Sequence, residues 1–107
     1  MYCVQILSCR DCLQCYAKKI VVITARPDTI YNRKYTEVEL SVHGLSYDLL
    51  FMYPSYLPQT YEYIFQFKKQ CRHNALHFLK ASPLFSVGDR EWDVGQYGGI
   101  GLLIDYK

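Results

Sequence analysis

The sequence predicts an α+β fold, with a predominantly antiparallel β-sheet of about five to seven strands and one amphipathic helix at about 69–81. The chain holds 11 Tyr and 5 Phe in 107 residues, and both residue types are enriched in strands. Several segments alternate apolar and polar residues, which is the period of a half-buried strand. One segment in the second half changes to the spacing of a helix.

A single domain is expected over 1–107, because this length matches one typical domain. Hydrophobic residues make up 50% of the chain and charged residues 21%. These shares are typical of globular proteins and argue against a disordered chain. The formal net charge of +2 is small, so it neither requires nor excludes a nucleic-acid partner.

The first residues do not resemble a signal peptide, because they have no basic start and their apolar run is short. No stretch approaches the ~20 apolar residues of a membrane span. We therefore expect an intracellular protein, cytoplasmic or nuclear and not secreted, with no membrane span. In that setting its 5 cysteines should be reduced thiols.

Two interpretations of the N-terminal segment stay open. Ser8 and Asp11 have the spacing of a helix N-terminus, which predicts a short helix at about 9–17. Alternatively, 2–7 and 17–25 are the two strands of a hairpin joined by a long loop. We favour the short helix.

The next segments predict strands. The run from Ile20 to Thr24 is β-branched and apolar on both faces, as in a central strand that is covered on both sides. Residues 36–43 alternate strictly, which places Val38, Leu40 and Val42 on one buried face. Because a glycine follows, we expect a hairpin over 36–53.

Two further strands complete the predicted sheet. Residues 61–67 carry four aromatic side chains at alternate positions, and we expect this row to face the core. An exposed row of this kind would instead be a platform for stacking nucleic-acid bases. Residues 100–106 are expected to form the last strand, which follows a glycine-rich turn.

The predicted helix at about 69–81 has two different sides. Cys71, Ala75, Phe78 and Leu79 form one apolar stripe, and a Ser-Pro pair at 82–83 should stop the helix. The opposite side is mainly basic, with Leu76 as its one apolar residue. A helix side that faced only solvent would not require a leucine there. We expect this side to bind a partner through Lys69, Arg72, His73, Leu76, His77 and Lys80.

The N-terminal cysteines are the candidate metal ligands. They are Cys3, Cys9, Cys12 and Cys15. Structural zinc usually takes two separated ligand pairs, and the sequence has no second C-x-x-C or C-x-x-H pair. We therefore expect buried thiols that act as small hydrophobes, with no cofactor. A zinc-stabilised module stays as an alternative.

No catalytic signature is present in the sequence. His73 and His77 have the spacing of a helical zinc site, but Asn74 stands where a zincin carries its general base. No nucleophile elbow or phosphate-binding loop occurs either. The sequence therefore predicts a protein that is not an enzyme.

These observations favour a small non-enzymatic interaction module. Short chains rich in Tyr and Cys are common among viral accessory and regulatory proteins. We expect the basic side of helix 69–81 to bind an acidic, partly apolar protein surface or a second copy of the chain, as a homodimer. An alternative is RNA or DNA binding, in which Lys68, Lys69, Arg72 and Lys80 contact phosphates.

Overall fold

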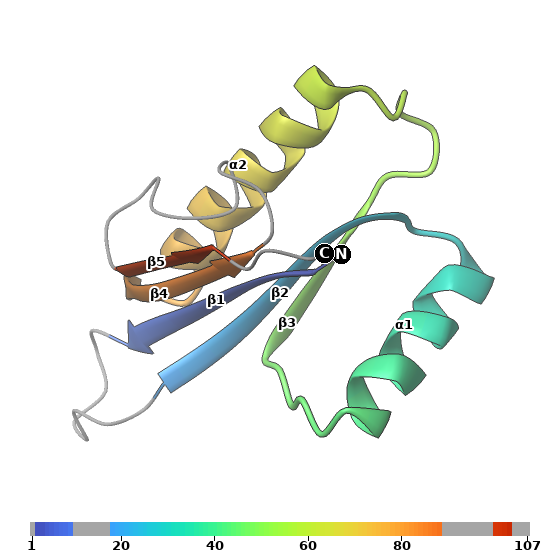
Figure 1. The fold of residues 1–107 in the computed structure, drawn as a ribbon. Helices are drawn as coiled ribbons and strands as arrows, with labels where there is room; N and C mark the ends of the chain where they lie inside the picture. The colour runs from blue at the N-terminus through green and yellow to red at the C-terminus, as the bar shows by residue number, and fades with distance from the viewer. Residues whose placement is uncertain (1, 10–17, 89–99, 104–107) are drawn as a thin grey trace.

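The structure, a computed structural model, describes residues 2–9, 18–88 and 100–103 of the chain. The described residues form five strands and two helices, so the predicted α+β class is confirmed (Figure 1). In chain order these elements are β1 (Tyr2–Cys9), β2 (Lys18–Pro27), α1 (Ile30–Val42), β3 (Leu49–Tyr53), α2 (Tyr61–Phe78), β4 (Ala81–Gly88) and β5 (Ile100–Leu103).

The strands form one sheet with the order β3-β2-β1-β4-β5. β1 is antiparallel to both of its neighbours, β2 and β4, whereas the outer pairs β2–β3 and β4–β5 are parallel. The sheet is therefore mixed, and the prediction of a predominantly antiparallel sheet is wrong. The physical reason at one edge is α1, because a helical crossover between β2 and β3 makes the two strands parallel.

β2 is the strand that the sequence predicts at 20–25, and it is an inner strand next to the edge strand β3. Its residues from Val21 to Thr24 are all buried, so side chains on both faces of the strand are covered. β1 pairs with β2 from Tyr2 opposite Thr24 to Ser8 opposite Lys18. The flanks of the N-terminal segment therefore follow the hairpin interpretation, while 10–17 lie outside the described residues.

The predicted strand at 36–43 is wrong, because these residues lie at the end of α1. A cap starts this helix: the Thr29 hydroxyl accepts a hydrogen bond from the backbone N–H of Asn32 at 3.1 Å. The buried residues of α1 are Thr36 and Leu40, four positions apart. Only the second half of the predicted hairpin is a strand, and it is β3.

The valines of α1 explain the error. Val38 and Val42 are four apart and Leu40 lies between them, so the three residues fit a strand of period two. In a helix, however, Leu40 points about 180° away from the valines, at 100° per residue. The structure buries Leu40 and leaves both valines exposed.

The predicted strand at 61–67 is also wrong, because it forms the first half of α2. The Thr60 hydroxyl accepts from the backbone N–H of Tyr63 at 3.5 Å and caps the helix. The rings of Tyr61 and Phe65 stack with centroids 6.2 Å apart, as side chains four apart on a helix can. Helix and strand periods both fit an aromatic run of this length, and the tertiary structure selects the helix.

α2 ends earlier than the predicted helix at 69–81. Its last residue is Phe78, and Lys80 adopts a left-handed φ of 49°, which is a common way to end a helix. The Ser-Pro pair at 82–83 lies inside β4 and is not the stop signal. Pro83 is tolerated in this inner strand because it pairs with Leu7 at a shift in register, where a bulge relieves the ladder.

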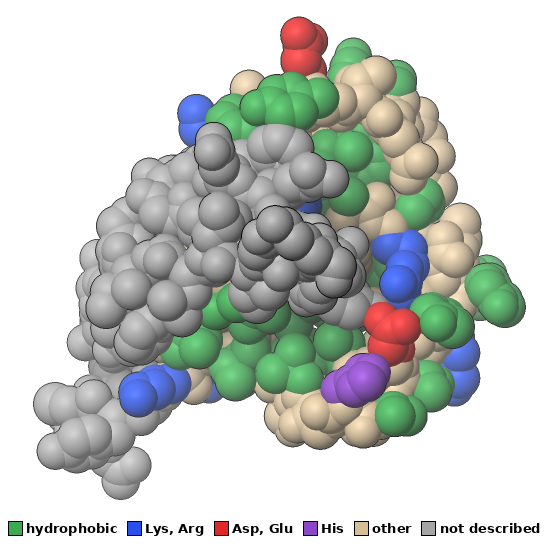
Figure 2. Space-filling model, viewed as in Figure 1, with side chains coloured by type: hydrophobic (Ala, Val, Ile, Leu, Met, Phe, Trp, Pro, Cys, Tyr) green, Lys and Arg blue, Asp and Glu red, His purple; other side chains and the backbone are tan. Residues whose placement is uncertain are grey.

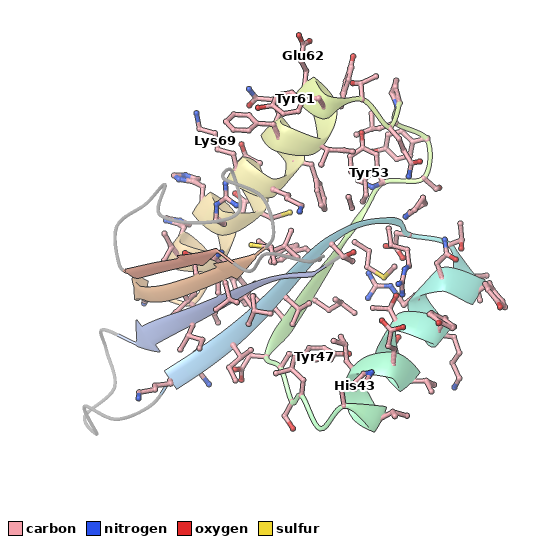
Figure 3. The ribbon with its side chains drawn as sticks, in the orientation of Figure 1. His43, Tyr47, Tyr53, Tyr61, Glu62 and Lys69 are labelled. Atoms are coloured by element: carbon pink, nitrogen blue, oxygen red, sulfur yellow. The ribbon has the colours of Figure 1, made fainter. Side chains whose placement is uncertain are left out.

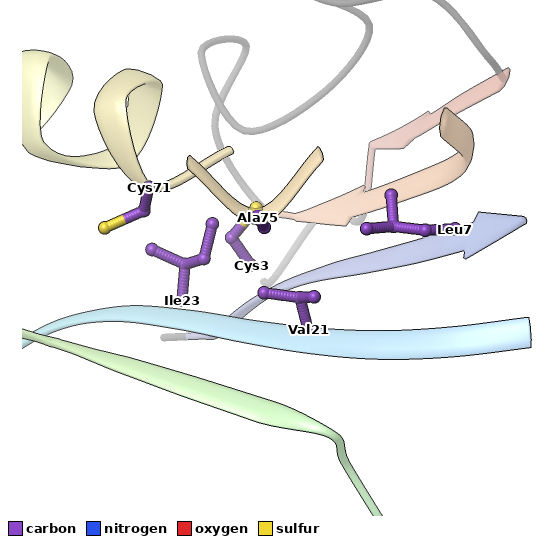
Figure 4. Close-up of a cluster of buried hydrophobic side chains, with 6 residues drawn as sticks. All are labelled: Cys3, Leu7, Val21, Ile23, Cys71 and Ala75. Carbon is purple, nitrogen blue, oxygen red and sulfur yellow. The ribbon is translucent and has the colours of Figure 1, made fainter. Parts of the chain in front are cut away.

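α2 packs on the sheet through small side chains. Cys71 and Ala75 lie over β1 and β2 (Figure 4), and the residues around them are almost completely buried. This cluster consists of Cys3, Leu7, Val21, Ile23, Cys71 and Ala75. The small side chains on α2 let its backbone approach the strands, so close packing fixes where the helix lies.

The segment between β3 and α2 is fixed by one tyrosine. Tyr53 is fully buried, and its hydroxyl donates a hydrogen bond to the carbonyl of Pro58. Its ring contacts Phe67 edge to face, with centroids 5.2 Å apart.

Neither described helix has the length and apolar character that a membrane crossing requires.

The caps of α1 and α2 lead to a stability prediction. Replacing Thr29 with Ala removes the shorter capping bond and should lower the free energy of unfolding by about 1 kcal/mol. Thr60→Ala removes the longer, weaker bond and should cost less. Urea unfolding of both variants measures the difference, and a larger loss for Thr60→Ala would contradict the capping geometry.

Candidate interaction surfaces

The predicted partner-binding side of α2 is only partly accessible. Lys69, His73 and His77 are exposed, as is Lys80 just beyond the helix. Arg72, in contrast, is only 3% exposed.

The burial of two apolar residues of α2 is also the reverse of the prediction. Leu76 is half-buried and packs against the core cluster, and Phe78, predicted to lie in the core stripe, is 73% exposed. The six predicted residues therefore do not form one exposed surface.

The error comes from two charged residues. The buried side of α2 consists of Lys68, Cys71, Arg72 and Ala75, which follow the spacing i, i+3, i+4, i+7 of a helix face. Lysine and arginine are rarely buried, so the sequence pattern places both on the exposed side. Because Lys68 and Arg72 are buried, the side of α2 that faces the core is rotated relative to the predicted apolar stripe and includes Leu76.

This burial also affects the predicted nucleic-acid contacts. Of the four predicted phosphate contacts, Lys68 and Arg72 are 4% and 3% exposed. Only Lys69 and Lys80 remain accessible. A phosphate-binding surface on α2 is therefore smaller than the sequence suggests.

A short polar chain crosses the sheet beneath α2. Ser86 of β4 donates a hydrogen bond to Gln5 Oε1 of β1 at 3.0 Å, and Gln5 Nε2 donates to the Cys3 sulfur at 3.0 Å. Both Gln5 and Ser86 are 4% exposed. These bonds give the buried polar groups partners, so the penalty for an unsatisfied buried group is avoided. They also link β1 to β4.

The two cysteines whose side chains are described are buried thiols. Cys3 and Cys71 belong to the core cluster, and neither is part of a disulfide. Burial raises the pKa of Cys71 to about 12, the neighbouring Arg72 opposes this effect, and Cys3 adds to it. Cys71 is therefore a neutral thiol and a weak nucleophile.

Of the candidate zinc ligands, only the side chain of Cys3 is described. Cys12 and Cys15 lie outside the described residues, as does the side chain of Cys9. Within the described part of the chain, no three His, Cys, Asp or Glu residues form a metal-binding group.

The histidines do not meet at one site. His43 lies at the end of α1, whereas His73 and His77 lie on α2, near Lys69 in the sequence. Figure 3 shows His43 at the lower right, beside the end of α1, and Lys69 well away from it at the upper left, on α2.

An open apolar hollow of about 240 Å³ lies between β3 and α2. Leu49 and Phe51 line it from the strand, and Asn74 and Phe78 line it from the helix. Its volume is below the usual range of ligand pockets, about 300–1,000 Å³. No titratable side chain is among these lining residues.

Four exposed hydrophobic side chains lie along one side of α1, where the sequence analysis placed no site. Tyr31 is 77% exposed, Tyr35 51%, Val38 52% and Val42 76%. We call these four residues the α1 stripe. Hydrophobic side chains recur in Figure 2 at the lower right, over α1, with charged side chains between them. Their helical spacing was visible in the sequence but was masked by the alternation over 36–43.

Arg26 holds one border of the α1 stripe in place. Its guanidinium lies 5.0 Å from the centroid of the Tyr35 ring, a cation–π geometry. The same side chain donates to the Thr36 hydroxyl at 2.7 Å and lies 3.7 Å from a Glu39 carboxylate oxygen. These contacts connect α1 to the end of β2 and limit the motion of the tyrosine ring.

A second ion pair fixes the start of α1. Arg33 donates two hydrogen bonds to the Asp28 carboxylate, at 2.9 and 3.0 Å. The bonds from Arg33 hold the pKa of Asp28 below its usual value, and partial burial opposes this effect. The first turn of α1 is therefore tied back to the loop after β2.

Comparison of the chain with protein-family models, with curated proteins and with solved structures gave no match.

The orientation of α2 leads to a prediction that reverses the sequence-based one. Leu76→Ala removes side-chain atoms packed against the core cluster and should lower the free energy of unfolding by about 1–2 kcal/mol. Phe78→Ala removes a larger but mostly exposed side chain and should change stability by less than about 0.5 kcal/mol. Chemical denaturation of both variants tests this, and a larger loss at position 78 would place Phe78 in the core.

The buried thiol of Cys71 gives a second prediction. At about pH 9 an ordinary thiol is largely ionised and reacts quickly with iodoacetamide. In the native protein Cys71 should stay protonated and unmodified, whereas in denaturant it should react fully. Peptide mass mapping of both samples measures this, and equal modification in the two states would show that Cys71 is accessible.

The same pKa shift has a consequence for stability. The native thiol keeps its proton up to about pH 12, while the unfolded chain loses it near pH 9. Since the unfolded state binds fewer protons in this window, the contribution of Cys71 to stability should fall as pH rises from about 9 to 12.

Proposed function

We propose that this protein is a non-enzymatic interaction module that binds a protein partner through the α1 stripe. The observation that carries the proposal is the exposure of four apolar side chains along one line of a 13-residue helix. Single exposed apolar residues are common on protein surfaces, but apolar residues gathered on one side of a helix and bordered by polar side chains are typical of interaction sites. Tyrosine is, in addition, enriched at interfaces.

The magnitude of the exposed surface supports this proposal. Tyr31 and Tyr35 together leave on the order of 250 Å² of side chain in water, since a tyrosine can bury about 200 Å². At about 25 cal/mol per Å², covering that surface would be worth roughly 6 kcal/mol before the costs of association. The two valines of the stripe add to this value.

The side of α1 opposite the stripe explains why the helix is stable without a partner. Leu40 is 4% exposed and Thr36 is fully buried, so the helix already packs on its own domain. Both are on the far side of the helix from the stripe at 100° per residue. A partner would therefore bind a preformed helix and would not need to fold it.

The exposed basic residues of α2 are a second surface in this proposal. An acidic partner region would complement its exposed residues Lys69, His73, His77 and Lys80. The chain needs no cofactor and no catalytic group for such a role. The buried thiols of Cys3 and Cys71 support an intracellular location, and the composition supports a regulatory or viral accessory role.

The proposal is tested with a variant that makes the stripe polar. Tyr31→Ser combined with Val38→Ser should leave the fold intact, because neither side chain is buried. The variant should lose the partners that the unaltered chain retains in affinity purification from its natural host cell, or should lose self-association.

The matched control is Phe78→Ser, which removes an exposed aromatic side chain from a different element. It should keep every partner of the α1 stripe. If the stripe variant, with an unchanged circular dichroism spectrum, keeps all partners and the same mass in solution, then the α1 stripe is not the interaction surface.

A further inference from the structure

We propose that the partner of the α1 stripe is a second copy of this chain, and that the two α1 helices pair in parallel. The inference depends on the proposed function, since it names the partner of that surface. It is carried by the spacing of the stripe and by the charges on its two borders.

The spacing of the α1 stripe is that of a coiled-coil seam. Tyr31, Tyr35, Val38 and Val42 are separated by four, three and four positions. At 100° per residue all four lie within about 60° of the helix circumference. Apolar residues at alternating separations of three and four form the a and d positions of a two-helix interface.

The borders of the stripe carry opposite charges at matching positions. With Tyr35 and Val42 at a and Tyr31 and Val38 at d, Lys34 occupies a g position and Glu39 the following e position. In parallel helix pairs a g residue faces the e residue five positions further along the partner helix. Lys34 of each copy therefore faces Glu39 of the other, and the two-fold axis repeats the pair.

The antiparallel arrangement lacks this complementarity. There g faces g and e faces e, so Lys34 would face Ser41 or its own counterpart. The only acid among these border positions, Glu39, would then lie beside Asn32 or its own counterpart. Parallel pairing is the arrangement that gives both charges an opposite partner.

The geometry of one protomer leaves room for the pair. Leu40, at the f position, is buried on the side of α1 that faces away from the seam. The remainder of each domain therefore lies outside the helix pair. Arg26 lies 5.0 Å from the centroid of the Tyr35 ring and 3.7 Å from Glu39, so it holds a seam residue and a border residue in place before association.

The size of the interface predicts weak association. A helix of 13 residues is about 20 Å long and contributes two a and two d residues to the seam. Two such helices bury close to or below the lower limit of specific interfaces, about 1,200 Å² in total. We therefore expect a dimer in the micromolar range or weaker.

The first experiment measures mass in solution by sedimentation velocity from about 1 μM to about 500 μM protein. This range includes the dissociation constants expected of a small interface. The unaltered chain should move from monomer to dimer over this range. The stripe variant Tyr31→Ser with Val38→Ser should stay monomeric, and Phe78→Ser should dimerise like the unaltered chain.

The second experiment uses charge reversal on separate chains. Lys34→Glu alone and Glu39→Lys alone each create two like-charged pairs in a parallel homodimer, and each should dimerise at least about fivefold more weakly. Mixing the two variants restores two opposite pairs, so a heterodimer should form at least as tightly as the unaltered homodimer. Circular dichroism checks that Glu39→Lys, which also loses the contact with Arg26, keeps the fold.

Three results would overturn the proposal. A chain that stays monomeric up to about 500 μM does not pair through α1. A dimer that survives the stripe variant uses another surface. Single variants that dimerise normally, or a mixture that gains nothing over them, exclude the parallel arrangement. If the chain is monomeric but its stripe variant loses a different protein partner, self-pairing is excluded and the proposed function is retained.

Discussion

The close approach of α2 to the sheet is the constraint on which the rest of the structure depends. Ala75 and Cys71 are nearly inaccessible, and they bring the helix backbone onto β1 and β2. A larger side chain at position 75 would separate the layers, because protein interiors have no spare volume for it. This contact fixes the rotation of α2, which buries Lys68 and Arg72 and exposes Phe78.

The other helix is held in a different way. α1 is tied to the end of β2 by polar contacts through Arg26 and by the Asp28–Arg33 pair, with only Thr36 and Leu40 buried. A helix anchored on one narrow side leaves most of its surface to solvent. Because its exposed side is apolar and regularly spaced, the same arrangement that makes α1 peripheral also makes it suitable for binding.

The sequence is most reliable where local pattern and burial agree. The apolar, β-branched run from Ile20 to Thr24 predicts a central strand, and it is β2. The helical spacing after position 69 is also correct. The segments 36–43 and 61–67 fail because alternating residues in a short run fit both a strand and one side of a helix. Their caps, Thr29 and Thr60, are the local signals that distinguish the two.

The sequence by itself determined the α+β class, the position of the inner strand β2 and the presence of a helix after residue 69. It did so because these features depend on periods and propensities that neighbouring residues share. Only the tertiary structure decided which side of each helix faces the core. For α2 that choice reverses Leu76 with Phe78, because it depends on contacts with β1 and β2, strands far from α2 in the chain. For α1 it buries Thr36 and Leu40 and leaves the α1 stripe in solvent.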